Sequence, residues 1–360
     1  MSVSMLCEEL SKIGFYTEVY TTTANGRNEL DVLPGKQMKV DGVTVTYFKR
    51  LTKDHTHFSP ALLARLWFQV KKFDAVHIHA WWNLASVFSC LFALLRNVPV
   101  IISPRGTLSA YSFQNKNIGI KWAIHHLLGK HLLNKCHLLV TSQREKEAIA
   151  AIVVPKSITL LPNFVSLPPQ RSCLSIKPSA CLKLLFFSRI EQKKGLEILL
   201  NALPMVSVPY SLTIAGDGDE NYIKQLKALA KRNQIGDKID WAGFQNEGKF
   251  SMLQKHDLFV LPSYDENFGN AVIESLAVGT PVLISEEVGL AAYVVKNNLG
   301  WVCETTPASV SAVINDIGNN SFAIVEKISG YAPQIIYKDF NPDNLVKKYA
   351  DMYNEIINDR

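Results

Sequence analysis

The sequence predicts an α/β protein made of two doubly wound domains, each built around a parallel sheet. Apolar runs of strand length alternate with amphipathic helical stretches in two successive series. Between the series, residues 166–180 contain three prolines and four serines, a composition that suits neither helix nor strand. Such alternation is typical of repeated strand–helix–strand units. We therefore expect one domain over 1–165, a linker over 166–180 and a second domain over 181–335.

The first series begins with a helix over 2–13, closed by Gly14. A doubly wound domain normally begins with a strand near the centre of its sheet. We therefore expect the first strand of this domain to be missing, either because it lies upstream or because part of the site has been lost. Further strands are expected at 15–22, 43–48, 74–79, 98–102, 138–141 and 158–161, with helices at 59–71, at 83–95 and after the capping residue Ser142.

The second series repeats this architecture and ends in an additional helix. A final amphipathic stretch over 343–357 follows Asn341-Pro342, and we treat 336–360 as a separate C-terminal segment. Strands of this series are expected at 183–187, 211–215, 238–241, 257–261, 281–284 and 300–303, with helices between them.

Composition and charge narrow the class of protein. The chain has 360 residues, of which 48% are hydrophobic and 19% charged, as in a soluble globular protein. The net charge of +6 is spread along the chain, which gives no reason to expect nucleic-acid binding. The six cysteines form no C-x-x-C pair and no signal peptide is evident. We therefore expect a cytoplasmic protein without a disulfide framework or a zinc knuckle.

One segment could bring the chain to a membrane surface. The longest apolar run, Leu84 to Leu95, is only twelve residues long and too short to span a bilayer. The segment 116–135 combines lysines and histidines with Trp122 and several leucines. Such a helix can lie on the anionic inner face of the cytoplasmic membrane, or it can bury one side in a domain core. Peripheral membrane contact through 116–135 is therefore one of two interpretations.

A strand–loop–helix unit in the second half carries two acids. The apolar strand ends at Leu261, Glu266 lies in the loop, and Glu274 lies in a helix expected over 269–278. The first turn of that helix, after Phe268-Gly269, offers unpaired backbone N–H groups and the positive end of a dipole, which suit a phosphate. The alternative is an ordinary unit of this kind whose acids are solvated.

Two motifs of this half resemble those of a known enzyme family. Glu266 and Glu274 flank Phe-Gly, and the second glutamate begins Glu274-Ser-Leu-Ala-Val-Gly-Thr-Pro-Val282. An Arg and a Lys, Arg189 and Lys194, lie five positions apart just after the first strand of the second domain. Together they resemble the signature of family-four retaining glycosyltransferases. The resemblance covers 181–300 closely and the first domain loosely, because the Gly-Gly turn that relatives carry near the start is absent.

The resemblance implies the GT-B fold, in which two Rossmann-like domains face a cleft and the last helix crosses back to the first domain. It implies that Arg189 and Lys194 hold the diphosphate of a nucleotide-sugar donor, on which negative charge grows during transfer. The alternative is two solvated charges. It further implies that Glu266 contacts the donor sugar and that the leaving phosphate takes the acceptor proton in a front-face attack. These three residues are the catalytic candidates.

The resemblance also implies a set of donor-binding positions. Glu274 would bind the ribose hydroxyls, since a carboxylate can accept two hydrogen bonds. Backbone amides around Phe268 would hold sugar hydroxyls or phosphates, and the strand end after Trp241 would pass near the base, although Trp241 could instead be a core residue. The implied donor-binding residues are Gly243, Phe244, Phe268, Gly269, Asn270 and Glu274.

No metal or cofactor is expected. Asp217 and Asp219 form the Asp-x-Asp pattern that holds a metal in other glycosyltransferases, but here it lies between a strand and a helix, and we favour a turn. His77 and His79 share one face of a strand, which makes a metal pair conceivable, but no third ligand is evident. Structural histidines are the preferred interpretation.

Two residues of the first half are candidates for the acceptor side. His79 lies at the carboxyl end of its strand, where open α/β sheets bind ligands. Arg105 follows the next strand, near the place where many relatives carry a His that approaches the reacting centre. An arginine there could hold a phosphate or an acidic acceptor.

We therefore expect a metal-independent retaining hexosyltransferase. It would move a sugar from a nucleotide-diphosphate donor to a glycan, lipid-linked in a bacterial surface-polysaccharide pathway. One rival is a GT-B nucleotide-sugar epimerase, which would turn over its donor without an acceptor. The other is a non-catalytic sugar-nucleotide-binding protein, which the missing first strand and Gly-Gly turn would favour.

Overall fold

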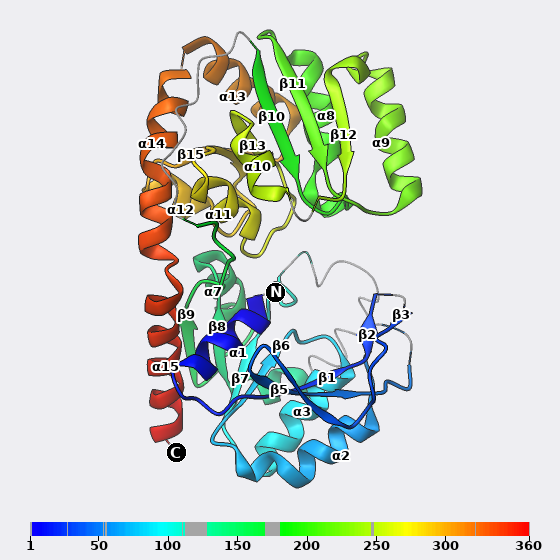
Figure 1. The fold of residues 1–360 in the computed structure, drawn as a ribbon, viewed down its shortest axis with the longest axis vertical. Coiled ribbons are helices and arrows are strands. Elements are labelled where there is room, and N and C mark those ends of the chain that lie inside the picture. The colour runs from blue at the N-terminus through cyan, green and yellow to red at the C-terminus, as the bar shows by residue number, and fades with distance from the viewer. Residues whose placement is uncertain are drawn as a thin grey trace. The chain divides into compact units, whose positions relative to one another are not determined.

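The chain forms two compact units, seen in the computed structural model of Figure 1. The first unit comprises Met1–Phe164 and Pro342–Arg360, and the second comprises Val165–Asn341. The structure describes residues 2–26, 28–52, 54, 56–109, 111, 128–169, 181–245, 248–320 and 322–359. Most of the expected linker, 170–180, and most of the basic segment, 116–127, lie outside the described residues.

The second unit is built around a six-stranded parallel sheet with the order β12-β11-β10-β13-β14-β15. Its strands are β10 (Leu182–Phe187), β11 (Tyr210–Ala215), β12 (Ile239–Gly243), β13 (Leu258–Leu261), β14 (Val282–Ser285) and β15 (Gly300–Cys303). Successive strands run outward from β10 to β12, and the chain then returns to place β13 on the other side of β10. The order therefore reverses between β10 and β13, and all six carboxyl ends share one edge.

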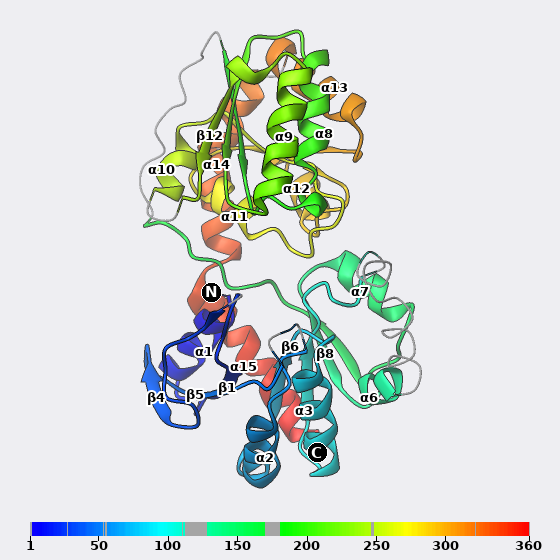
Figure 2. The same ribbon diagram turned by 90° about the vertical axis from the view of Figure 1, so that its right-hand side faces the viewer.

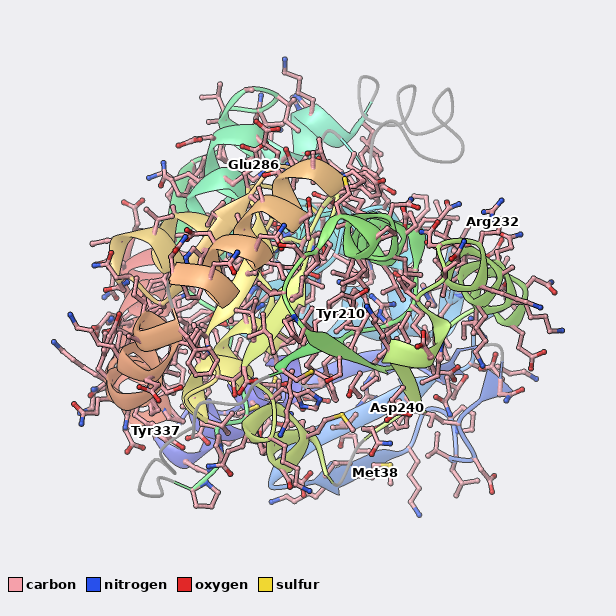
Figure 3. All side chains as sticks on the ribbon, turned by 90° about the horizontal axis from the view of Figure 1, so that it is seen from above. Met38, Tyr210, Arg232, Asp240, Glu286 and Tyr337 are labelled. Atoms are coloured by element: carbon pink, nitrogen blue, oxygen red, sulfur yellow. The ribbon has the colours of Figure 1, made fainter. Side chains whose placement is uncertain are left out.

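Helices enclose this sheet, and its inner strands are almost entirely apolar. The described helices are α8 (Leu196–Ala202), α9 (Glu220–Arg232), α10 (Lys249–Gln254), α11 (Asn270–Ala277), α12 (Ala291–Lys296), α13 (Pro307–Asn320) and α14 (Phe322–Asp339). All residues of β13 and β14 are buried, as expected of parallel strands covered on both faces. At the opposite, amino edge, Tyr210 begins β11 (Figure 3) and packs its ring 4.6 Å from Lys238 Nζ.

The strands of the first unit form separate sheets. A parallel sheet has the order β6-β7-β8-β9, and a three-stranded sheet has the order β1-β5-β4. The strands are β1 (Glu18–Thr22), β2 (Ala24–Asn25), β3 (Asn28–Glu29), β4 (Gln37–Val40), β5 (Val43–Phe48), β6 (Val76–His79), β7 (Val100–Ser103), β8 (His137–Val140) and β9 (Ser157–Leu160). Among the described residues no strand bonds to both β1 and β6. In the described part of the chain, the single sheet expected for the first domain is therefore divided into separate sheets.

Every strand expected in the two series is present, with ends shifted by a few residues, but the short antiparallel strands were not predicted. β4 pairs antiparallel with β5, and β2 pairs with β3. All four residues of β4 are exposed, and Met38 (Figure 3) lies in this strand. The sequence of β4, Gln-Met-Lys-Val, alternates polar and apolar residues over only four positions, the shortest run from which alternation indicates a strand.

The final helix packs within the first unit. The described helices of this unit are α1 (Ser2–Lys12), α2 (Pro60–Gln69), α3 (Leu84–Leu95), α6 (Lys130–Leu133), α7 (Gln143–Ala150) and α15 (Pro342–Asn358). Figure 2 shows α15 beside α1, and Tyr349 and Tyr353 join a buried cluster with Ile101 of β7 and Leu139 of β8. His77 Nδ1 lies 2.6 Å from the Tyr353 hydroxyl. No helix in the described ranges is long and apolar enough to cross a bilayer.

Candidate active site

An ion pair lies where the strand order of the second unit reverses. Lys194 ends the short 3-10 turn after β10, and its Nζ donates a hydrogen bond to Oε2 of Glu266 in the loop after β13. The Lys194 side chain is 8% exposed and the Glu266 side chain 18%. Open α/β sheets bind ligands outside the carboxyl ends of their strands at such a reversal. The pair thus occupies the expected ligand position of this sheet.

Backbone contacts set the distance between the two partners. Gly195 has φ of +66°, and a Cβ there would lie 2.0 Å from the carbonyl oxygen of Pro262. Tyr264 N donates to the carbonyl of Lys193 at 2.9 Å. Only glycine permits this backbone approach, because it has no Cβ and adopts positive φ without strain. The turn that carries Lys194 is therefore held directly against the loop that carries Glu266.

The amino end of α11 lies beside Glu266. Gly269 precedes the helix with φ of +98°, and a Cβ there would lie 3.7 Å from Glu266 Cγ. The Phe268 side chain is buried and packs 6.2 Å from the Phe340 ring, measured between centroids. Only the backbone of Phe268 is therefore placed to meet a ligand. The first N–H groups of α11 follow at Asn270, which is partly exposed.

A second ion pair involves Glu274. Lys249 Nζ, at the start of α10, lies 2.7 Å from Oε1 of Glu274 in α11. Burial raises the pKa of Glu274, and the hydrogen bond and charge of Lys249 oppose that rise. Lys249 pairs with Oε1 only, which leaves Oε2 as an acceptor for a ligand hydroxyl.

A backbone turn and an exposed aromatic ring lie at the carboxyl ends of the outer strands β11 and β12. Gly216 N, after β11, donates to the carbonyl of Gly243 at the end of β12, over 2.8 Å. The side chain of Phe244 follows and is 73% exposed. A solvent-facing ring at this edge is suited to stacking on a nucleotide base. Trp241 packs partly against the core, and Lys227 Nζ lies 5.3 Å from its ring centroid.

The Asp-x-Asp pattern serves local structure. The side chain of Asp219 caps α9 by accepting hydrogen bonds from Asn221 N and Tyr222 N at 3.0 Å. Asp217 Oδ1 accepts from Gly218 N at 2.8 Å. These contacts favour the turn over the metal site as the explanation of this motif. Across the described ranges no three His, Cys, Asp or Glu side chains cluster as metal ligands.

Arg189 has a different environment from Lys194. Its side chain is 73% exposed, and Nη1 lies 2.8 Å from Oε1 of Glu191. The structure thus brings Lys194 and Glu266 into contact, whereas Arg189 pairs with a neighbour in the chain. Any contact of Arg189 with a diphosphate would require this exposed side chain to leave Glu191.

Two family models match the chain. Residues 177–335 match the model described as glycosyl transferases group 1, and residues 1–167 match the model described as glycosyltransferase family 4. The chain belongs to glycosyltransferase family four. The two matches cover both units, and the first includes Lys194, Glu266 and Glu274.

Individual relatives agree with this assignment. The glycosyltransferase is 29% identical over 143 residues to AmsK, an amylovoran biosynthesis glycosyltransferase of Erwinia amylovora. The aligned residues cover 37% of this chain and 35% of AmsK. Its fold resembles a sucrose-phosphate synthase from Thermosynechococcus elongatus, with a TM-score of 0.78, 18% identity and coverage of 99% and 93% of the two chains. It also resembles Anabaena HepE in complex with UDP-glucose, with a TM-score of 0.68, 18% identity and coverage of 88% and 87%. The fold is GT-B, as expected.

In the first unit, the acceptor-side candidates of the glycosyltransferase touch each other. Arg105 Nε donates to Nδ1 of His79 at 3.2 Å, and both side chains are partly exposed. His79 is the last residue of β6, and Arg105 follows the neighbouring strand β7. His77 has both ring nitrogens engaged, by Tyr353 and by Ser103 Oγ at 2.8 Å, as expected of a structural histidine.

Several partners of these residues were not identified from sequence. Lys249 lies in no motif, and its pairing with Glu274 depends on how α10 packs against α11. Ser142 Oγ caps Glu145 N, as expected of the capping residue, but the Glu145 carboxylate accepts from Thr141 N and Gly106 N. An acidic residue in the first turn of a helix is visible in the local sequence, but its hydrogen-bond partner in another loop is not.

Proposed function

We propose that this glycosyltransferase moves a sugar from a nucleotide-diphosphate donor, held at the carboxyl edge of the second unit's sheet, to a glycan acceptor with retention of configuration. The observation that carries the proposal is the Lys194–Glu266 pair at the reversal of strand order, beside the amino end of α11. A cation, a helix end and a carboxylate in one place match the needs of a diphosphate and a sugar.

The pair suggests how the donor is engaged. In the free protein Lys194 and Glu266 neutralise each other. An incoming diphosphate would compete for Lys194, and Glu266 would then accept hydrogen bonds from the donor sugar. As the bond from the anomeric carbon to the phosphate oxygen breaks, Lys194 and the α11 amides stabilise the growing negative charge. The acceptor oxygen bonds to the same face of that carbon, and its proton passes to the leaving phosphate.

The proposed transfer needs no metal, because protein groups supply the positive charge. Lys194 is fixed by the turn before Gly195, and Arg189 is free to swing from its exposed contact with Glu191. Asp217 and Asp219 are occupied by their own turn and helix cap. Activity should therefore persist at saturating EDTA.

The proposed pathway is polysaccharide biosynthesis with a lipid-linked glycan acceptor. Support comes from AmsK, which is named for amylovoran biosynthesis. UDP-sugars are the first donors to test, since the Anabaena HepE structure contains UDP-glucose. Action at the cytoplasmic membrane, with contact through 116–135, remains a prediction from sequence.

The test is a thermal-shift screen of the purified protein against UDP-, GDP- and ADP-sugars. The best donor is then assayed for release of nucleoside diphosphate with and without glycan acceptors. Stabilisation by a donor and acceptor-dependent release would support the proposal. Conversion of the donor sugar without acceptor would indicate an epimerase instead. Binding without any turnover would indicate a non-catalytic sugar-nucleotide-binding protein.

A further inference from the structure

Arg105 and His79 together present hydrogen-bond donors for which the described residues offer no acceptor. Arg105 uses Nε for His79 Nδ1 and Nη1 for Ser2 Oγ at 2.8 Å and Asn163 Oδ1 at 2.9 Å. Among the described residues nothing accepts from its Nη2. Since a guanidinium can only donate, His79 Nδ1 must be the acceptor, and the proton of the neutral ring sits on Nε2. This Nε2–H also has no acceptor in the described part of the chain.

No acid of the described ranges contacts Arg105 to neutralise its charge. Burial and the neighbouring Arg105 charge lower the pKa of His77 to about 3, and the pKa of His79 is also lowered well below its ordinary value. Both rings are therefore neutral at pH 7. The charge of Glu145 acts on Arg105, but the carboxylate oxygens of Glu145 already accept from Gly106 N at 2.8 Å, Thr141 N at 2.9 Å and Thr141 Oγ1 at 3.1 Å.

The sequence around His79 and Arg105 is positively charged, like Arg105 itself. Between 75 and 144 the chain contains seven lysines and arginines and no aspartate or glutamate. The described part of this stretch includes β6, α3, β7 and β8, which form most of the first unit's parallel sheet region. Such a one-signed region attracts anions to the unit.

The backbone at Arg105 is strained and is held in place by other residues. Arg105 has φ of +52°, which costs a residue with a Cβ about 1–3 kcal/mol. Glu145 fixes the next residue through Gly106 N, and Thr107 Oγ1 closes the turn on the carbonyl of Pro104 at 2.6 Å. Strain that a structure maintains in this way is concentrated at functional sites. Here it aims a guanidinium at the carboxyl edge of the sheet.

We propose that Arg105 and His79 form an oxyanion site for a phosphoryl group on the acceptor. The guanidinium would donate Nη2–H to the phosphoryl oxygens, and His79 would donate Nε2–H while its Nδ1 keeps Arg105 oriented. This inference rests on the proposed glycosyl transfer, and it specifies that the acceptor is anionic. The phosphoryl group can belong to a lipid diphosphate or to a free phosphorylated glycan.

The test measures binding of inorganic pyrophosphate by calorimetry, in a Lys194→Ala background that removes the cation of the proposed donor site. Arg105→Gln should weaken binding at least about tenfold, the loss expected for a charged hydrogen-bonded contact. Arg105→Lys keeps the charge and should show an intermediate loss, which also covers the case in which Arg105→Gln does not fold. Arg144→Gln, an exposed arginine of the same unit, is the matched control.

A second arm distinguishes the two sources of the phosphoryl group. Phosphatidylcholine vesicles with and without a polyprenyl diphosphate are tested by flotation for binding that depends on Arg105. If only vesicle binding depends on Arg105, the acceptor is lipid-linked. If both vesicle binding and pyrophosphate binding depend on Arg105, the phosphoryl group suffices. If the Arg105 variants bind both pyrophosphate and vesicles as tightly as the Arg144→Gln control does, the inference is overturned.

The two proposals can fail separately. If turnover requires an acceptor but anion binding does not depend on Arg105, the proposed glycosyl transfer is supported and the oxyanion site is contradicted. Pyrophosphate binding that requires Arg105, in a protein with no donor turnover, would support the oxyanion site and contradict the proposed transfer.

Discussion

Lys249 and Glu274 form an ion pair that ties the first residue of α10 to the middle of α11. Nζ and Oε1 are 2.7 Å apart, and the side chains are only 16% and 9% exposed. Burial raises the pKa of the Glu274 carboxyl, and the hydrogen bond and charge of Lys249 oppose that rise. The pair also aligns the helix whose amino end lies beside Glu266.

Replacing Lys249 with Met should destabilise the second unit and weaken nucleotide binding. The substitution keeps most of the side-chain volume but leaves Glu274 buried without a partner, which should cost about 2 kcal/mol of unfolding free energy. The pKa of Glu274 should rise further, so nucleotide affinity should fall as pH decreases. Urea unfolding and calorimetry with nucleoside diphosphate measure both effects. Lys255→Met, on the exposed end of the same segment, should change neither.

Lys194 and its neighbour Lys193 should differ sharply in nucleotide binding. Lys194→Ala removes the cation beside Glu266 and should weaken nucleoside diphosphate binding about tenfold or more. Lys193 lies 3.8 Å from Asp265 and is more exposed, so Lys193→Ala should alter affinity less than about twofold. Equal losses in the two variants would remove Lys194 from the donor site.

Glu266 should matter for turnover more than for binding. Because its carboxylate occupies Lys194 in the free protein, Glu266→Gln removes a competitor of the diphosphate. Nucleoside diphosphate should bind as tightly as before or more tightly, while the rate of sugar transfer falls by about a hundredfold or more. Single-turnover assays with saturating donor measure the rate, and weaker nucleotide binding with normal turnover would contradict the assignment.

Gly195 should tolerate no side chain. A Cβ would meet the Pro262 carbonyl at 2.0 Å in a backbone with φ of +66°. We expect Gly195→Ala to lower the unfolding free energy by about 2–4 kcal/mol and to separate Lys194 from Glu266. Gly236→Ala is the control, since nothing lies within 4 Å of its added Cβ. A thermal melt of both variants compares the stability losses, and similar melting temperatures would show that the turn can relax.

The first unit should lose stability on acidification through His77. The pKa of His77 is lowered to about 3 in the folded state, whereas an unfolded histidine titrates near about 6.5. Between these values the unfolded chain binds a proton that the native chain does not. The contribution is therefore fully present above pH 6.5 and is lost as pH falls, by at most about 1.4 kcal/mol per pH unit. Urea unfolding of His77→Gln should show a shallower slope between pH 6 and 4, and an unchanged slope would contradict this account.

Local patterns were sufficient for the second unit's site loops. The apolar runs of β10 and β13 and the helix after Phe268-Gly269 are each contiguous in sequence, so hydrophobic periodicity and glycine positions predict them. By contrast, β4 was missed because its alternating pattern covers only four residues. The division of the first unit's strands into separate sheets also depends on pairing between distant segments, which no local pattern records.

The sequence by itself determined the α/β architecture, the succession of strands and helices along the chain, and the strand–loop–helix unit that carries Glu266 and Glu274. These features follow from hydrophobic spacing and turn chemistry within short stretches of chain. The tertiary structure decided the partners: Glu266 for Lys194, Lys249 for Glu274, and His79, Ser2 and Asn163 for Arg105. A charge is stabilised by whatever lies within a few ångströms of it, and that neighbourhood exists only after helices and strands from distant parts of the chain have packed.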